Sequence, residues 1–303
     1  MTLLRVAERP ELRRPLLLAA FTGWGDGGTA ASGALGYLLG DPPPAACAIV
    51  DPEACFDFTV ARPITRRGDD GRWLLEYPEL AIHAVRRPDA DRDLLIVTGP
   101  EPHTNWPSLA RGLARFAAEV GVDTALTLGA FIGPVSHRRT PIVRRTPNPG
   151  FDARLAALGM EDTTYSGPTA FVTALLHALD DAGIAAASLW AAVPPYLGSP
   201  NPAVSLALLE AVERAADLGL ELGGLRGTAT DFVRKVEGAL RENPEVADQL
   251  GKLFEAEAAD DGGGRDEVSV DDVPEGAPDL PSGRALVEEL ERFLRSERSG
   301  QDE

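Results

Sequence analysis

Histidines and carboxylates that could exchange protons follow several apolar segments of this chain. Glu101 and His103 come after one such segment, Asp26 after another and His137 after a third. An imidazole titrates near neutral pH and a neighbouring carboxylate fixes its tautomer, so either histidine beside either carboxylate would make an acid/base pair. The sequence has no Gly-x-Ser-x-Gly nucleophile elbow and no His-Glu-x-x-His zinc motif to accompany such a pair. An acid/base site is therefore one hypothesis, and no metal site is predicted.

A glycine-rich loop, Thr22-Gly-Trp-Gly-Asp-Gly-Gly-Thr29, lies between an apolar run at 16–21 and an alanine-rich helical segment at 30–39. Glycines allow left-handed backbone, and the first turn of a helix presents free N–H groups, so the loop could bind an anion or another ligand. The spacing is neither Gly-x-Gly-x-x-Gly nor a Walker loop, so no dinucleotide, ATP or other cofactor is predicted. The alternative is a tight turn capped by Asp26 or Thr29, with Trp24 as a packing anchor. The candidate site residues here are Gly23, Trp24, Asp26, Gly27 and Gly28.

Strand-like and helical patterns alternate along the chain. Strands are predicted at 16–21, 46–50, 93–98, 124–128 and 188–193, with a hairpin made of 73–77 and 80–85. Helices are predicted at 30–39, 109–120, 151–158, 169–181, 203–218 and 230–240. This alternation predicts an α/β fold with a mostly parallel central sheet flanked by helices.

The loops that follow parallel strands meet at the carboxyl edge of the sheet, where α/β proteins build their sites. We call this edge the rim. Besides the glycine-rich loop, the candidate residues expected there are Glu101, His103, Trp106, His137, Gly167, Pro168, Thr169 and Tyr196.

The C-terminal quarter of the chain changes character. Beyond a core domain at 1–225, helical spacing continues over 226–259, with a break expected near Asn243-Pro244. Residues 255–279 hold ten acids and one arginine, so 260–283 is predicted to be a flexible linker. Residues 284–298 carry an apolar stripe and are predicted to form an amphipathic helix. That helix would dock on its own subunit or on a partner.

Composition excludes several classes of protein. The 303 residues carry a net charge of −18, which argues against binding to nucleic acid or to an anionic membrane surface. The first residues do not resemble a signal peptide, and no apolar run approaches the roughly 20 residues of a membrane-spanning helix. Two cysteines, Cys47 and Cys55, are too few for a disulfide framework. We therefore expect a reduced, cytoplasmic protein.

Four motifs in this order resemble the proteasome-assembly-chaperone-two family, in its bacterial and archaeal branch, and the richness in Ala, Arg and Gly is typical of an actinobacterium. The motifs are Gly23-Trp-Gly-Asp-Gly-Gly28 with Ala30-Ala-Ser32, Thr98-Gly-Pro-Glu-Pro102 with Trp106, Tyr165-Ser-Gly-Pro-Thr169, and Ser188-Leu-Trp-Ala191 leading to Pro194-Pro-Tyr196 and Ser199-Pro-Asn-Pro202. The resemblance covers about 16–218. It implies a fold similar to the nucleoside phosphorylases, a homo-oligomer for which a trimer is one candidate, and a protein partner in proteasome assembly.

Two departures from the family pattern bear on function. The family often shows Pro-His-Tyr where this chain has Pro194-Pro-Tyr196, so no shared catalytic histidine can be placed there. The chain also ends Ser299-Gly-Gln-Asp-Glu303, without the hydrophobic-Tyr-x tail that archaeal relatives insert into the proteasome ring. We expect an assembly chaperone or protein-binding scaffold. The alternative is a small-molecule binding protein or enzyme, with a nucleoside or an amine as ligand, that uses the glycine-rich rim.

Overall fold

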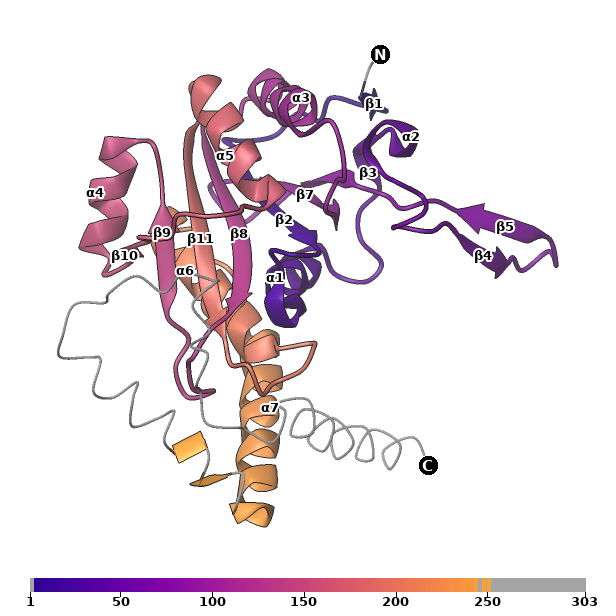
Figure 1. The fold of residues 1–303 in the computed structure, drawn as a ribbon. Coiled ribbons are helices and arrows are strands. Elements are labelled where there is room, and N and C mark those ends of the chain that lie inside the picture. The colour runs from indigo at the N-terminus through magenta and orange to yellow at the C-terminus, as the bar shows by residue number, and fades with distance from the viewer. Residues whose placement is uncertain (1–2, 245–246, 249, 252–303) are drawn as a thin grey trace.

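The computed structural model describes residues 3–244, 247–248 and 250–251, and these form an α/β fold around a nine-stranded sheet (Figure 1). Across the sheet the strands are β1 (Leu4–Val6), β3 (Ala46–Val50), β6 (Ala81–Val85), β7 (Leu94–Pro100), β2 (Leu16–Thr22), β8 (Thr124–Ile132), β11 (Ala185–Val193), β9 (Ile142–Arg145) and β10 (Glu161–Asp162). The expected class, a central sheet flanked by helices, is confirmed. The likeness to nucleoside phosphorylases stays a prediction.

The centre of the sheet is parallel and its flanks are largely antiparallel. Strands β7, β2, β8 and β11 run in one direction, whereas β6 pairs antiparallel with β7, and β9 pairs antiparallel with β11. In β2, residues 16–20 are apolar and fully buried, as expected for a strand covered on both faces. The carboxyl ends of the four central strands therefore lie at one edge, which is the predicted rim.

Helices cover both faces of the sheet. Alternate residues of β2 point into two apolar clusters: Leu17 and Ala19 pack with α3 (Trp106–Glu119) and α5 (Phe171–Asp181). Leu16 and Leu18 pack in the other cluster, with α1 (Ala30–Leu39), α4 (Pro149–Ala157) and α6 (Pro202–Ala216). Two short helices, the 3-10 turn Gly27–Thr29 and α2 (Pro52–Cys55), lie in loops near the rim.

The predicted hairpin of 73–77 with 80–85 is wrong. Strand β5 (Trp73–Glu76) pairs instead with β4 (Ile64–Arg67) in a separate two-stranded sheet, while β6 joins the main sheet between β3 and β7. The turn signal overlooked in the sequence is Gly68-Asp-Asp-Gly71, where the Gly68 N–H donates to Arg72 O and Gly71 has a φ of +78°. We call residues 60–77 the arm, and Figure 1 shows β4 and β5 extending away from the main sheet.

Several element bounds also differ from those expected. Strand β8 continues to Ile132, so residues 129–132 are strand rather than loop, and Trp106 opens helix α3 instead of lying in the loop before it. Strand β8 extends to Ile132 because β11 pairs with it as far as Val193, which lies opposite Ile132. No helix within the described ranges is long and apolar enough to cross a membrane.

Helix α7 (Gly223–Glu242) follows α6 and carries the chain away from the sheet (Figure 1). It begins three residues before the expected boundary at 226, and it ends beside the expected break near Asn243. Val236 and Leu240 pack against Tyr196 and Leu197 of the loop after β11. The predicted boundary between a core domain at 1–225 and a helical extension at 226–259 stays a prediction. The linker at 260–283 and the helix at 284–298 lie outside the described residues.

Candidate functional site

Asp26 caps helix α1 rather than facing an open site. One carboxylate oxygen, Oδ1, accepts the backbone N–H groups of Ala31 at 2.8 Å and Ser32 at 3.1 Å, and Oδ2 accepts the Ser32 hydroxyl at 2.5 Å. Thr29, the other predicted cap, makes no such side-chain bond. Burial raises the pKa of Asp26, although the hydrogen bonds from Ser32 and Ala31 oppose that rise. The first-turn amides that could have bound an anion are thus occupied by the protein's own carboxylate.

The glycines of the loop are required by close packing. Gly28 has a φ of +63°, and a Cβ there would lie 3.2 Å from both Asn201 Cβ and Val193 Cγ1. Gly23 has a φ of +138° and lies against Glu101, whereas Gly27 has no positive φ and faces the carbonyl of Ala130. Main-chain bonds from Ala130 N–H to Gly25 O and from Asn201 N–H to Gly28 O tie this loop to β8 and to the start of α6. This geometry agrees with the tight-turn interpretation.

Glu101 and His103 point to different neighbours. Glu101 Oε1 accepts the N–H of Phe171 at 2.6 Å and so caps α5. His103 is exposed, and its Nδ1 accepts the N–H of Asp57 at 2.9 Å, beside the ring of Phe56. In the part of the chain that the structure describes, no hydrogen bond or ion pair joins His103 to Asp26 or Glu101. The predicted acid/base pair with His103 is not formed.

The candidate site residues that lie near α3 and α5 make contacts that stabilise the fold. The Trp106 ring packs against Phe171, and its indole N–H donates to Pro102 O at 2.5 Å. Gly167, Pro168 and Thr169 are exposed in the segment before α5. The Tyr165 hydroxyl donates to Pro168 O, and the Thr169 hydroxyl contacts that of Thr173. These contacts fix the turn that leads into α5.

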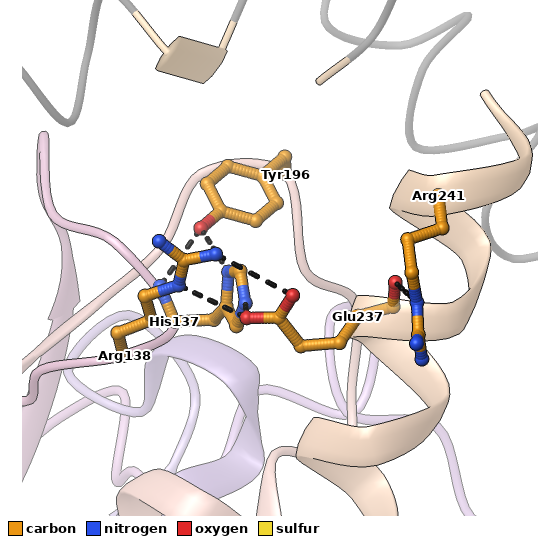
Figure 2. A network of polar contacts seen from close by, with 5 residues as sticks. All are labelled: His137, Arg138, Tyr196, Glu237 and Arg241. Atoms are coloured by element: carbon orange, nitrogen blue, oxygen red, sulfur yellow. Dashed lines mark hydrogen bonds and ion pairs between the residues drawn. The ribbon is translucent and has the colours of Figure 1, made fainter. Parts of the chain in front are cut away.

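His137 lies in a polar network in which His137 and Tyr196 are buried and Arg138 is exposed, and which the sequence did not reveal as a whole (Figure 2). The hydroxyl of Tyr196 is 2.8 Å from both the backbone N and the ring Nδ1 of His137, and His137 Nε2 is 3.0 Å from Glu237 Oε1. Arg138 Nε donates to the same Glu237 oxygen at 2.9 Å. His137 and Tyr196 were predicted at the rim, but Arg138 and Glu237 were missed.

The electrostatics of this network follow from its geometry. Arg138 and then His137 lower the pKa of Glu237, and Glu237 in turn raises the pKa of Arg138. Glu237 is on α7, 100 residues from His137 in the chain, so no local motif could have linked them. The network joins the loop after β8, the loop after β11 and α7. The loop after β11 and α7 are also held together by the apolar packing around Tyr196.

A second polar group near the rim centres on Trp190, which belongs to one of the four family motifs and was not among the predicted site residues. Its indole N–H donates to Ser188 Oγ, which also accepts the hydroxyl of Thr127. The ring lies over Gly129, where any Cβ would come within 2.6 Å of it, and it also approaches Gly25. Trp190 therefore fills the space below the glycine-rich loop.

Three large apolar side chains remain exposed at the rim. Trp24, a packing anchor in the tight-turn interpretation and a candidate site residue in the other, is 57% exposed, and Phe131 and Ile132 at the end of β8 are exposed as well. Ile132 lies near the glycine loop, because its Cδ1 would be 3.4 Å from a Cβ at Gly27. We call Trp24, Phe131 and Ile132 the rim patch.

A pocket of about 770 Å³ lies at the opposite edge of the sheet, among residues that precede β2, β7 and β8, including Arg13, Asp93 and Gly121.

The described residues contain no group of three or more His, Cys, Asp or Glu side chains that could hold a metal ion. Cys47 and Cys55 are both buried and free, and burial raises the pKa of Cys55 to about 11, which keeps this thiol protonated at neutral pH.

Both the sequence and the fold of this chain resemble those of known proteins. Residues 20–240 match the model of the PAC2 family. A PAC2 family protein from Streptomyces avermitilis is 36% identical, with 74% of this chain and 95% of that chain covered and a TM-score of 0.67. A proteasome-assembly chaperone homologue from Mycobacterium tuberculosis is 33% identical, with 77% and 98% covered and a TM-score of 0.69.

A more distant solved structure, PbaB of Pyrococcus furiosus, described as an archaeal proteasome activator, shares the fold at 19% identity. It covers 77% of this chain and 98% of its own, with a TM-score of 0.59. A search of curated proteins found no match. These findings confirm the family resemblance expected from the four sequence motifs.

Proposed function

The chain belongs to the PAC2 family, and we propose that it acts in the cytoplasm as an assembly chaperone or protein-binding scaffold for proteasome subunits. The similarity to a proteasome-assembly chaperone homologue over most of both chains supports this role. A chaperone of this kind needs a surface that binds polypeptide, and we propose that the rim patch is that surface.

The observation that carries the proposal is the contrast between polar and apolar groups at the rim. Asp26 and Glu101 are bound by the first-turn amides of α1 and α5, so their hydrogen-bonding capacity serves the fold. Trp24, Phe131 and Ile132 are instead exposed to solvent at this edge, and Phe131 and Ile132 point to opposite faces of β8 because they are consecutive residues of one strand. Exposed aromatic and aliphatic side chains are common in protein interfaces, where a few such residues supply most of the binding energy.

The alternative, a small-molecule enzyme at the same rim, has less support. Such a site would need an apolar cavity with converging polar groups. The polar groups predicted for it point instead to separate neighbours, His103 toward Asp57 and His137 toward Glu237.

A binding and assembly assay with purified actinobacterial proteasome α- and β-subunits tests the proposal. The protein should bind at least one subunit type and change the rate at which rings and particles form on native gels. The double variant Trp24→Ser/Ile132→Ser should bind about 30-fold more weakly, the loss expected for interface hot spots.

Leu158→Ser provides the matched control, because Leu158 is also an exposed apolar residue, 37% exposed, but lies outside the rim patch at the end of α4. This variant should bind like the parent. If the parent binds neither subunit and leaves assembly unchanged, the proposed function is wrong. If the parent binds and the rim variant binds equally well, the function stands and the rim patch is not the surface.

A further inference from the structure

The pocket of about 770 Å³ at the edge of the sheet opposite the rim, which we call the amino-edge pocket, is held by the core. Its lining residues come from the segments that precede β2, β7 and β8. Asp93 ties the first two segments together, because its Oδ2 accepts the N–H of Arg13 at 2.7 Å and its Oδ1 accepts the N–H of Arg87 at 2.8 Å. The walls of the pocket are therefore fixed relative to one another.

The lining combines apolar groups with arginines. The apolar residues are Pro10, Leu12, Pro88 and Val120, and the arginines are Arg9, Arg13 and Arg86. Two of the three lining acids already have partners, since Glu119 pairs with Arg9 at 2.9 Å and Asp93 accepts backbone amides; Glu11 is the third.

Two of the lining arginines have charges that no carboxylate neutralises. The Arg13 guanidinium donates to the carbonyls of Arg87 and Pro88, and Arg86 is exposed. Among the described residues neither Arg13 nor Arg86 forms an ion pair. The pocket thus suits an apolar surface that is bordered by carboxylates.

The predicted helix at 284–298 has this complementary pattern. At about 100° per residue, its apolar residues fall on one side, and they are Leu286, Val287, Leu290, Phe293 and Leu294. Glu289 and Glu291 fall at the two borders of this stripe, and Glu297 continues it. Arg298 is the one base close to the stripe, whereas Arg292 and Arg295 fall on the far side. Amphipathic helices bind apolar pockets in this way, with charges matched at the borders.

The chain is long enough to bring the helix to the pocket of the same molecule. The described chain ends beside the rim, where Leu250 packs with Tyr196 and Leu197. The rim and the amino edge are separated by the length of β8, nine residues or about 30 Å. The 32 residues at 252–283 span up to about 100 Å when extended. A tether of this kind raises the local concentration of the helix, so a modest affinity is enough for docking.

The rim patch is nearer to the end of the described chain, but it suits the helix less well. Phe131 and Ile132 point to opposite faces of β8, so one helix cannot cover both. The stripe from Leu286 to Leu294 is about 12 Å long and needs a continuous apolar surface.

We propose that the predicted helix at 284–298 docks in the amino-edge pocket of its own chain. Leu290 and Phe293 contact the apolar lining, and Glu289 and Glu291 lie near Arg13 and Arg86. The pocket is closed to other ligands while the helix is docked. This inference is independent of the proposed function, because it concerns the edge of the sheet opposite the rim patch.

Disulfide trapping in the full chain tests where the helix lies. Leu12→Cys/Leu290→Cys should form a disulfide within one chain under mild oxidation, identified by mass spectrometry of the digested protein. The native cysteines, Cys47 and Cys55, are buried and should not compete. Ile132→Cys/Leu290→Cys is the matched control, which places the first cysteine at the rim and should form the disulfide at least about tenfold more slowly.

Hydrogen exchange gives a second measurement that needs no new bond. Amides at 286–294 should be protected in the parent, and Leu12→Ser/Arg86→Glu should make them exchange at least about tenfold faster. Arg86→Glu alone should have a smaller effect, which Glu289→Arg/Glu291→Arg should reverse by exchanging the charges. Arg111→Glu is the control, because Arg111 is exposed on α3 and does not line the pocket. Far-UV circular dichroism checks that each variant keeps its fold.

Several results would overturn the inference. One is equally fast trapping at the rim, and another is a disulfide that joins Leu12→Cys of one chain to Leu290→Cys of a second copy. Fast exchange at 286–294 in the parent, or slow exchange that the pocket variants leave unchanged, would do the same. Neither assay contains a proteasome subunit, so the failure of subunit binding would remove the proposed function alone.

Discussion

At the scale of single residues, Asp26 shows how a candidate acid becomes part of the fold. Its carboxylate accepts two amides and a hydroxyl at the start of α1. Asp26→Ala should lower the free energy of unfolding by about 1–2 kcal/mol, the usual loss for a helix cap. Asp26→Asn should cost less, because the amide oxygen can still accept the Ala31 N–H. Thermal and urea unfolding of both variants measure the difference, and an Asn variant as unstable as the Ala variant would contradict the capping role.

Glu237 gives the His137 network a dependence on pH. Its folded pKa is lowered, chiefly by Arg138, so its ionised form stabilises the fold above the ordinary glutamate pKa of about 4.3. That contribution is lost as the pH falls through the lower, folded pKa. Glu237→Gln should therefore be less stable than the parent at neutral pH, and the gap should narrow as the pH falls below about 4. Urea unfolding at a series of pH values tests this, and a gap that does not change with pH would contradict it.

At the scale of elements, the turn into α1 depends on one glycine. Gly28 has a φ of +63° and two side chains 3.2 Å from any added Cβ, so Gly28→Ala should destabilise the protein by about 1–3 kcal/mol. Gly36, inside α1, has nothing within 4 Å of an added Cβ. Gly36→Ala is the matched control and should stabilise by up to about 1 kcal/mol. Equal melting temperatures for the two variants would show that the turn is not strained as described.

At the scale of the whole molecule, the C-terminal quarter is predicted to combine a tether with a docking helix. The sequence predicts a flexible linker at 260–283 and an amphipathic helix at 284–298, both outside the described residues. Hydrogen exchange should be fast over 262–281 and slow over 286–294 if the helix docks on the core or on another subunit. Equally fast exchange in both segments would mean that the helix is free in the isolated protein.

The sequence by itself determined the elements whose signal is local. The apolar run at 16–21 predicts β2 because a buried parallel strand needs apolar residues on both faces, and the glycine pattern after it predicts the turn into α1. The order of four motifs was enough to identify the family. The arm escaped prediction because β4, Ile64-Thr-Arg-Arg67, has a single apolar residue and no strand pattern, whereas the segments on both sides of Pro78-Glu79 are apolar.

Only the tertiary structure decided what the candidate site residues do. A carboxylate near a helix start can be a cap or an acid, and the difference depends on whether amides reach it, as those of Ala31 and Phe171 reach Asp26 and Glu101. The contact of His137 with Glu237 joins residues 100 positions apart, and no local pattern encodes a bond that exists only after α7 packs beside Tyr196. The sequence specifies which side chains are present, but tertiary packing determines which groups each of them contacts.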